Sequence, residues 1–422
     1  MLRPRLGLLL AVGATLVLVA CSEKTEAGRS CPLLCPAQAI TLADTTIEAA
    51  VVSDTTVQGL PSIGNETFMM LASHGDSLDS RVIVRYDTLP QSYTKSTIDS
   101  TIVNIDTAQL VTPIALPDSA HRPTAPFTIE AYDVDTTATD TVASILGSLF
   151  RPNRLIGSKT FAPESLKDTL RIPISTDTVL DRVKNGTRLR VGLRVVSSQG
   201  VDLRIASVTS GTPVTLRIKA SLDTGATDVN VQPLSRTPVN QDFLRLPLAD
   251  YTIFLKGGSS NPETILAVGG VPSRRVFMRF DVPSKIIDST TVVRASLLLT
   301  QVPNRRLTPT DSVFVYPLAI LAGPAISDVG SALQFIGPNG QFGLDSVSLA
   351  PGDSGVKSFE IVGLVRTWRN QPTTVSPRTI ALRSGAEGSL PAEIDFFSSK
   401  AAPALRPKLR ITFVPQTSYG LP

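Results

Sequence analysis

Two short segments of the chain place an arginine, an aromatic residue and an aspartate in a row. They are Arg85-Tyr86-Asp87 and Arg279-Phe280-Asp281. A guanidinium group can bind a carboxylate through two parallel hydrogen bonds, so either arginine could hold an acidic ligand such as a uronic acid. An arginine and an aspartate at this spacing can also form a structural pair. We favour the structural interpretation, because residues that two segments share are as readily fold determinants as ligand groups.

A second candidate site surrounds the single tryptophan. Trp368 lies between Arg366 and Arg369. An exposed indole could stack on a sugar ring, and neighbouring arginines would suit an acidic sugar. With Arg383, these residues form the predicted ligand-binding set. The alternative, which we favour, is a ring that fills the core of the fold, because only 5% of the residues are aromatic and an extended aromatic platform is not supported.

Metal and enzyme chemistry find little support. Asp133, Asp135 and Asp140 are close enough in sequence to hold a loop Ca²⁺, but the run lacks the glycine and the closing glutamate of an EF-hand loop. We therefore predict no metal site and no cofactor, with Ca²⁺ in this loop as the alternative. The two histidines, His74 and His121, lie far apart, and no catalytic or phosphate-binding motif is present. The sequence indicates a protein that is not an enzyme.

The N-terminus carries the most specific signal. Two arginines precede an apolar run over residues 6–20, which is short for a membrane span, and the run ends in Leu18-Val19-Ala20-Cys21. This segment resembles the lipobox of bacterial lipoproteins. The resemblance implies a signal peptide over 1–20, removed before Cys21, and acylation of that cysteine. Several acyl chains on one residue anchor a protein stably. Ser22 stands where an aspartate would retain such a lipoprotein at the inner membrane, so the resemblance implies the outer membrane, in either leaflet.

Residues 21–43 are expected to form the acylated cysteine and a tether. Cys31 and Cys35 lie within it, and outside the cytoplasm a disulfide between them is plausible. A C-x3-C pair could instead bind a metal, but no nearby histidine or second cysteine pair completes a zinc site.

The charge balance differs between the two halves. The net charge of the chain is +4, which gives no support for nucleic-acid binding. Residues 44–230 carry 17 basic and 21 acidic side chains, and residues 231–422 carry 19 and 13. The second half is therefore the one expected to meet an acidic partner, although a mildly basic solvated surface explains the same balance.

The elements that must position these residues are short β-strands. Runs rich in Val, Ile, Thr and Leu alternate with Gly, Pro, Asn, Asp and Ser, which is typical of an all-β sandwich. In the strand at 81–87, Val82, Val84 and Tyr86 should face the core. The strand at 275–281 repeats the pattern. Ile83 and Phe277 lie on the opposite face and are also apolar, so we expect that face to be partly covered.

The repeat extends along the chain. Residues 53–59 match 249–255, 190–195 match 379–384, and 213–220 match 406–413, at offsets close to that of the central strand. The sequence thus predicts two copies of one jelly-roll-like antiparallel β-sandwich. The expected segments are 44–230 for the first, 231–235 for a linker, 236–416 for the second and 417–422 for a tail.

The second unit resembles the DNRLRE-type domains of bacterial surface and secreted proteins, which are jelly-roll sandwiches similar to carbohydrate-binding modules. The matching segments are 249–252, 274–282, 293–299, 365–368, 396–400 and 406–411. The first unit keeps the Arg-Tyr-Asp strand and the last strand but lacks the tryptophan, and the name-giving motif is literally present in neither unit. Some relatives bind acidic polysaccharides, and many have no known ligand, so the resemblance implies fold more than function.

Two functions remain open. The first is a lipid-anchored outer-membrane protein that binds an anionic polysaccharide without catalysis. The second is a structural or adhesive surface protein that docks other proteins and has no sugar site. A concave face lined by Arg366, Trp368, Arg369 and Arg383 would favour the first function, and a buried Trp368 would favour the second.

Overall fold

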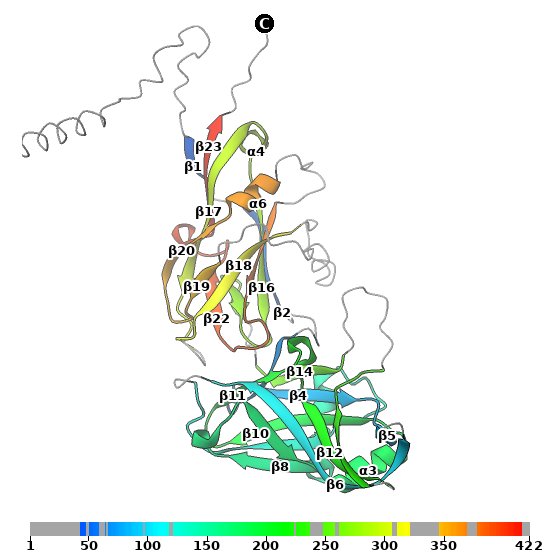
Figure 1. Cartoon of the computed structure of the whole chain (residues 1–422). Coiled ribbons are helices and arrows are strands. Elements are labelled where there is room, and N and C mark those ends of the chain that lie inside the picture. Colours follow the sequence, from blue (N-terminus) through cyan, green and yellow to red (C-terminus); the bar gives the residue numbers. More distant parts are fainter. Residues whose placement is uncertain are drawn as a thin grey trace, which may run out of the picture.

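The computed structural model consists of two antiparallel β-sandwiches (Figure 1). It describes residues 43–47, 50–58, 64, 66–95, 98–117, 121–222, 225–236, 248–257, 261–305, 310–320, 346–368 and 378–415. The predicted signal peptide, Cys21, the Cys31–Cys35 pair and the C-terminal tail lie outside the described residues. The prediction of an all-β fold with two jelly-roll-like sandwiches is confirmed.

The first sandwich is built mainly from the first repeat. Its strands are β3 (Phe68–Ser73), β4 (Asp79–Tyr86), β5 (Ser92–Lys95), β6 (Ile98–Ala115), β7 (Phe127–Asp133), β8 (Leu155–Phe161), β9 (Thr169–Pro173), β10 (Leu189–Ser197), β11 (Val201–Ala206), β12 (Thr215–Leu222), β13 (Gly225–Val231) and β14 (Asp250–Lys256). Two α-helices and three 3-10 turns join them: α2 (Ala143–Gly147), η1 (Pro152–Arg154), η2 (Pro163–Ser165), α3 (Thr176–Lys184) and η3 (Val208–Ser210).

The second sandwich repeats this plan. Its strands are β1 (Ala43–Ile47), β2 (Ala50–Gln58), β15 (Ile265–Gly269), β16 (Arg274–Asp281), β17 (Thr290–Val302), β18 (Val313–Ile320), β19 (Val347–Leu349), β20 (Gly355–Glu360), β21 (Thr379–Ser384), β22 (Glu393–Phe397) and β23 (Lys408–Pro415). The short helices α4 (Ser284–Asp288) and α6 (Val362–Thr367) and the turn η4 (Pro403–Leu405) complete it.

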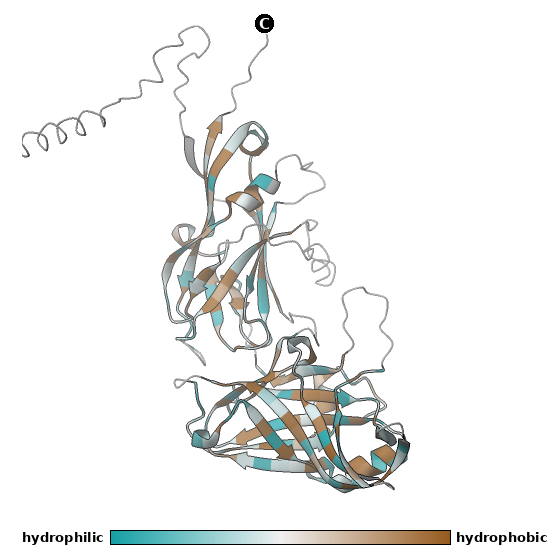
Figure 2. Ribbon diagram, in the orientation of Figure 1, coloured by the Kyte–Doolittle hydropathy of each residue, from teal (hydrophilic) through white to brown (hydrophobic). Residues whose placement is uncertain are grey.

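Each sandwich has its own apolar core, which the alternation of side chains creates (Figure 2). Val82, Val84 and Tyr86 lie in the first core, and their equivalents on β16 lie in the second, as predicted. The opposite faces of β4 and β16 are covered too. Ile83 packs with Tyr251 and Ile253 of β14, and Phe277 packs with β18 and β21. The prediction of a covered second face is confirmed.

The two repeats exchange one strand each. Strand β2 precedes the first sandwich in sequence but pairs with β16 of the second, and β14 follows the first sandwich but pairs with its β4. Residues 53–59 and 249–255 are the equivalent first strands of the two repeats, so the exchange is reciprocal. The predicted boundaries, 44–230 and 236–416, therefore do not describe the sheets strand by strand, because a strand pairs with whichever edge its ladder and side chains fit.

The predicted linker is also partly built into the first sandwich. Leu234 donates its backbone N–H to Arg85 O at 2.8 Å and accepts the N–H of Asp87 at 3.0 Å. Ser235 beside it is buried. Residues 234 and 235 thus extend the sheet at β4 instead of forming a free connection.

The N-terminal strands belong to the sandwich that the sequence places second. Strand β1 pairs with β23. The two lie at the end of the second sandwich that points away from the first (Figure 1). The first sandwich therefore lies farther from β1 than the second sandwich does (Figure 1).

Candidate functional site

The residues of the predicted tryptophan site do not form one site. Trp368 is only 4% exposed and packs in the second core, so its indole is not available as a platform for a sugar ring. Its predicted ligand role is wrong, and the favoured alternative, a ring in the core, is confirmed. Arg366 donates from Nε and Nη2 to Val292 O at 3.2 and 3.0 Å, where a β-bulge interrupts the pairing of β17. Arg383 lies over the ring of Tyr316. Arg369 lies outside the described residues.

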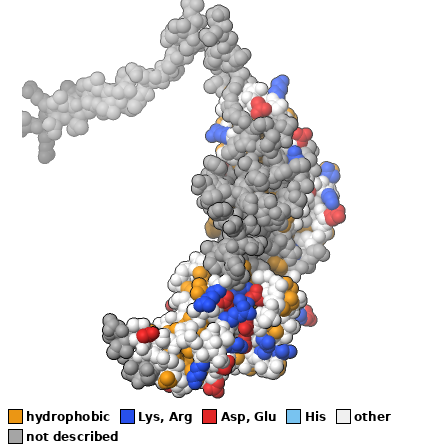
Figure 3. All heavy atoms as spheres, turned by 90° about the vertical axis from the view of Figure 1, so that its right-hand side faces the viewer, with side chains coloured by type: hydrophobic (Ala, Val, Ile, Leu, Met, Phe, Trp, Pro, Cys, Tyr) orange, Lys and Arg blue, Asp and Glu red, His pale blue; other side chains and the backbone are white. Residues whose placement is uncertain are grey.

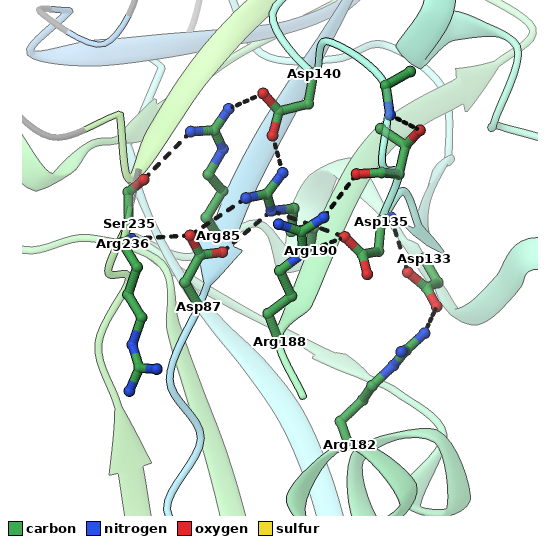
Figure 4. Close-up of polar contacts among 12 residues, drawn as sticks. Arg85, Asp87, Asp133, Asp135, Asp140, Arg182, Arg188, Arg190, Ser235 and Arg236 are labelled. Atoms are coloured by element: carbon green, nitrogen blue, oxygen red, sulfur yellow. Dashed lines mark hydrogen bonds and ion pairs between the residues drawn. The ribbon is translucent and has the colours of Figure 1, made fainter. Parts of the chain in front are cut away.

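A dense arginine–aspartate network is found on the first sandwich instead (Figure 4). Its centre is the pair of neighbouring strands β4 and β10, where Arg85 and Arg190 stand directly opposite each other in the ladder. Both are almost fully buried. Like charges at opposite positions destabilise a sheet, so this arrangement requires acidic partners.

Two aspartates supply the compensating charge. Asp140 Oδ1 accepts from Arg85 Nη2 at 2.7 Å, and its other oxygen pairs with Arg190 Nη1. Asp87 accepts from Arg190 Nε and Nη2 at 3.1 and 3.3 Å. Arg85 and Asp87 of the predicted triplet thus act structurally, but each pairs with a neighbour and not with the other.

The exchanged strand β14 completes this network. The hydroxyl of Tyr251 accepts from Arg85 Nη2 at 3.3 Å and donates to the backbone carbonyl of Asp140. The Arg85 guanidinium also lies 5.0 Å from the centre of the Tyr251 ring. Burial raises the pKa of Tyr251, so the hydroxyl is the neutral donor that this geometry requires.

Burial acts against the charge of Asp87 and the hydrogen bonds favour it. Desolvation raises the pKa of Asp87. The hydrogen bonds from Arg190 and from the backbone N–H of Arg236 together lower this pKa by more than desolvation raises it, so the net pKa lies below its ordinary value. Asp87 is therefore ionised at neutral pH and holds Arg190 in place.

The aspartates considered for Ca²⁺ are all engaged by arginines. Asp133 pairs with Arg182 at 2.8 Å and Asp135 with Arg188 at 2.7 Å. Arg154 adds bonds to the carbonyls of both aspartates at 3.0 Å. No cluster of potential metal ligands occurs among the described residues. A cation would have to displace several arginines to occupy this loop.

Helix α3 positions Arg182. Ser175 caps the helix by accepting the N–H of Thr178 at 3.2 Å. Val179 and Val183, one turn apart, face the core. Arg182 consequently projects to the side of the helix, toward Asp133 (Figure 4). Its place in the last helical turn is also favourable for a positive charge.

The open side of the network is a hollow of about 640 Å³. We call it the arginine-lined hollow; it is formed by Asp87, Asp135, Arg182, Thr187, Arg188, Arg190 and Arg236. Four arginines face two aspartates there, so the lining is basic. Basic and acidic side chains also gather in neighbouring positions on the face of the first sandwich that Figure 3 presents.

Several donors in the hollow have no protein partner within the described ranges. Arg236 uses Nε for Thr88 Oγ1, and the bonds of Arg188 leave Nη1 unused. Arg182 engages only Nη2. A guanidinium group offers five N–H donors in a fixed fork, so these three arginines can bind further oxygen atoms without breaking the network.

The second sandwich lacks the same arrangement. Thr379 stands opposite Arg279 at the position that Arg190 occupies opposite Arg85. Arg279 and Asp281 form no ion pair with another described residue. Burial lowers the pKa of Arg378, and the charges of Asp288 and then Asp281 oppose that effect. The network is thus a feature of the first repeat and not a requirement of the shared fold.

One of the two histidines lies where the sandwiches meet, and the other forms a pair within the first sandwich. His74 Nε2 contacts Asp202 Oδ2 at 2.9 Å, and His121 of the first sandwich pairs with Asp311 of the second. Apolar contacts between Met70, Leu78 and Val271 join the same surfaces. His121 therefore helps to hold the two sandwiches together.

A local cluster of basic residues in the sequence could have indicated the hollow, but the net charge of the first repeat did not reveal it. Residues 182–190 place four basic side chains in nine positions, and Arg236 follows a short strand pairing. Because residues 44–230 have a net negative charge, the acidic partner was expected at the second repeat. A binding site depends on the local distribution of charge and not on the net charge of the whole repeat.

Comparisons with known proteins give weak matches. No family model and no curated protein sequence matches the chain. A chain from Parabacteroides distasonis, provisionally described as a secreted protein, is 9% identical and has a TM-score of 0.23, with 88% of this chain and 99% of that chain covered. The tandem CBM22 domains of Paenibacillus barcinonensis Xyn10C are 8% identical, with a TM-score of 0.16 and coverages of 89% and 100%. These TM-scores are too low to support an argument about function.

No helix in the described part of the chain has the length and apolar character needed to cross a membrane.

Proposed function

We propose that this chain is a lipid-anchored, non-catalytic surface protein whose first sandwich binds an anionic polysaccharide. The observation that carries the proposal is the arginine-lined hollow, with its unused guanidinium donors on Arg182, Arg188 and Arg236. The DNRLRE resemblance of the sequence and the lipobox-like segment at Cys21 agree with it, and the site moves from the second repeat to the first.

The chemistry of the hollow suits carboxylate or sulfate groups on a sugar chain. The side chains of Arg182 and Arg188 are 25% and 35% exposed, and an aspartate fixes each guanidinium group, Arg182 through Nη2 and Arg188 through Nε. Fixed guanidinium groups lose little side-chain entropy on binding, which favours affinity. An acidic polymer presents such groups repeatedly, so after one group has bound, neighbouring groups bind at a high effective concentration.

The fold supports presentation of this hollow away from an anchor. Acylated Cys21 would be 22 residues before β1, which belongs to the second sandwich. The second sandwich would then lie next to the membrane, and the first sandwich would face outward with its hollow.

The hollow offers little for catalysis. Asp87 and Asp135, its two carboxylates, each accept hydrogen bonds from an arginine. General acid–base chemistry would need a carboxyl group free to exchange its proton with the substrate. We therefore propose binding without turnover.

The proposal is tested by affinity electrophoresis of residues 22–422 through gels that contain polygalacturonate, alginate, dextran sulfate, neutral dextran or no glycan. We expect retardation by one or more anionic glycans and none by neutral dextran. Arg188→Ala with Arg236→Ala should weaken binding about tenfold or more, since each charge-assisted hydrogen bond contributes roughly 1.5 kcal/mol. Arg217→Ala is the matched control, because Arg217 is an exposed arginine paired with Asp228 on β12 and β13, away from the hollow.

A structural or adhesive role is the second candidate. It is favoured by the burial of Trp368 and by the strand exchange, which joins the two sandwiches into one unit. Equal mobility of the chain in every gel would remove the polysaccharide proposal and leave this role.

A further inference from the structure

The exchanged strands carry a shared Asp-x-Thr motif, Asp54-Thr55-Thr56 on β2 and Asp250-Tyr251-Thr252 on β14. In the first sandwich, Asp250 accepts the backbone N–H of Val208 at 2.8 Å, and Thr252 Oγ1 accepts that of Met70 at 3.2 Å. These contacts fix the strand to elements beyond the one with which it pairs.

The second sandwich makes the same contacts with the other strand. Asp54 accepts the N–H of Ser399 at 2.6 Å and its hydroxyl at 2.8 Å, and Thr56 Oγ1 accepts the N–H of Ala267 at 3.1 Å. The donor positions are equivalent as well. Ser207, before Val208, and Ser398, before Ser399, each donate a hydroxyl hydrogen bond to the carbonyl of a glutamate.

The ladders have the same register. Ile253 lies opposite Arg81 on β4, and Val57 lies opposite Arg275 on β16. These two pairs are equivalent positions of the two repeats. We call the edges of β4 and β16 that receive the strands the acceptor edges. Each acceptor edge recognises its strand through the ladder, the aspartate and the threonine.

Nothing in these contacts requires that the strand and the acceptor edge belong to one chain. The strand already comes from the other repeat. The connection from β2 to β3 ties β2 to the first sandwich, and the connection from β14 to β15 ties β14 to the second, so these connections hold the exchanged strands within one molecule. Strand β1, which directly precedes β2 and pairs with β23, would move with β2. Addition of a strand to a sheet edge is a common mode of protein recognition, and exchange of an identical element is a low-cost route to oligomers.

We propose that each acceptor edge also binds the equivalent strand of a second copy of this chain, so that copies link through strand exchange. The contacts inside each sandwich stay the same. The balance between the closed monomer and linked copies is therefore set by concentration, because the strand's own connection gives it an effective concentration of about 1 mM.

The fraction of acceptor edges that hold a strand from another copy follows from the ratio of the chain concentration to this effective concentration. When chains refold at about 10 µM, roughly one acceptor edge in a hundred should hold a strand from another copy, and at about 1 mM roughly half should. Linked copies should persist after dilution, since a paired strand must leave its sheet before it can exchange.

The test uses two single-cysteine variants of the mature chain in which Cys21, Cys31 and Cys35 are replaced by serine. Ser53→Cys labels strand β2, and Arg279→Cys labels the residue opposite it on β16. Neither variant can form this cross-link within one chain. The two are mixed, unfolded in urea, refolded at about 10 µM or about 1 mM, and oxidised, and the disulfide-linked heterodimer is measured on a non-reducing gel. Val196→Cys, at an exposed position of β10, replaces Arg279→Cys as the matched control.

We expect the heterodimer of Ser53→Cys and Arg279→Cys to rise about fiftyfold between the two concentrations, well above the control pair. Adding Asp54→Ala and Thr56→Val to the Ser53→Cys chain should lower the yield about tenfold, because both motif contacts are lost. A second pair, Lys256→Cys with Asp79→Cys, tests the acceptor edge of β4 in the same way. Heterodimer no higher than the control pair at about 1 mM, for both acceptor edges, would overturn the proposal.

Discussion

Asp250 makes the stability of the first sandwich depend on pH in a direction opposite to that of most aspartates. Its side chain is buried, with 2% of the residue exposed, and it accepts the N–H of Val208. Burial raises its pKa to about 6, against the smaller opposing effect of that hydrogen bond. In the unfolded chain the carboxyl group should have its ordinary pKa of about 3.9.

The sign follows from proton binding. Between about pH 4 and pH 6 the folded state holds the proton of Asp250 more tightly than the unfolded state, so stability falls as the pH rises through this window. A pKa difference of about two corresponds to roughly 3 kcal/mol lost by pH 7. The carboxylate is tolerated because the Asp-x-Thr contact requires an acceptor at this position.

Urea unfolding of wild type and Asp250→Asn at pH 4.5, 5.5, 6.5 and 7.5 tests this reasoning. The amide keeps an oxygen for Val208 and cannot ionise. The free energy of unfolding of wild type relative to Asp250→Asn should therefore decrease by roughly 2 kcal/mol from pH 4.5 to pH 7.5. Asp250→Ala is the matched control, and it should be less stable than Asp250→Asn by roughly 1–3 kcal/mol, because Val208 N–H loses its acceptor. A difference between wild type and Asp250→Asn that stays constant over this range would refute the argument.

Three further predictions concern the second core, the arginine–aspartate network and the pair of His74 and Asp202. Trp368→Ala should lower the free energy of unfolding by roughly 3–5 kcal/mol without changing the retardation of the folded chain by anionic glycans; selective loss of retardation in a fully folded variant would restore the tryptophan site. Arg190→Met leaves buried Asp87 without its main partner and should cost roughly 3–5 kcal/mol in urea unfolding; a neutral effect would mean that the network does not stabilise the sandwich. The hydrogen bond that His74 donates to Asp202 raises the pKa of His74 against the opposing effect of burial. The stabilisation from this pair is complete below about pH 6.5 and is lost as the pH rises through the folded pKa; His74→Asn should abolish that part of the pH dependence, and an unchanged pH profile would contradict it.

The sequence predicted the strands well because side-chain alternation is a local property. The apolar faces of β4 and β16 follow directly from residues 82–86 and 276–280, and the covered second faces follow from Ile83 and Phe277. Repetition along the chain then predicted two sandwiches of one design.

The exchange could not be predicted in this way, because the repeat makes the two acceptor edges equivalent. Residues 53–59 and 249–255 have the same motif and register, so the sequence pattern fits the exchanged and the direct pairing equally. The choice depends on the connections and on the contacts between the sandwiches, which no local pattern encodes.

For the candidate site too, the sequence identified individual residues but not their arrangement in space. The sequence singled out Arg85, Asp87, Asp133, Asp135 and Asp140 in separate segments, and the structure brings all five into one network. Their convergence with Arg182, Arg188 and Arg190 depends on the pairing of β10 with β4 and β7. Trp368 was the most conspicuous side chain, but hydrophobic burial outweighed its potential as a sugar platform.

An arginine footprint shows directly whether the arginine-lined hollow binds an anionic polysaccharide. The chain is treated with phenylglyoxal with and without polygalacturonate, and modification of each arginine is measured by peptide mass spectrometry. We expect polygalacturonate to protect Arg182, Arg188 and Arg236 of the arginine-lined hollow and to leave Arg217 and Arg294, which lie outside it, equally reactive. Protection of Arg294 and not of the hollow, or equal modification at every arginine at a glycan concentration that retards the chain, would contradict it.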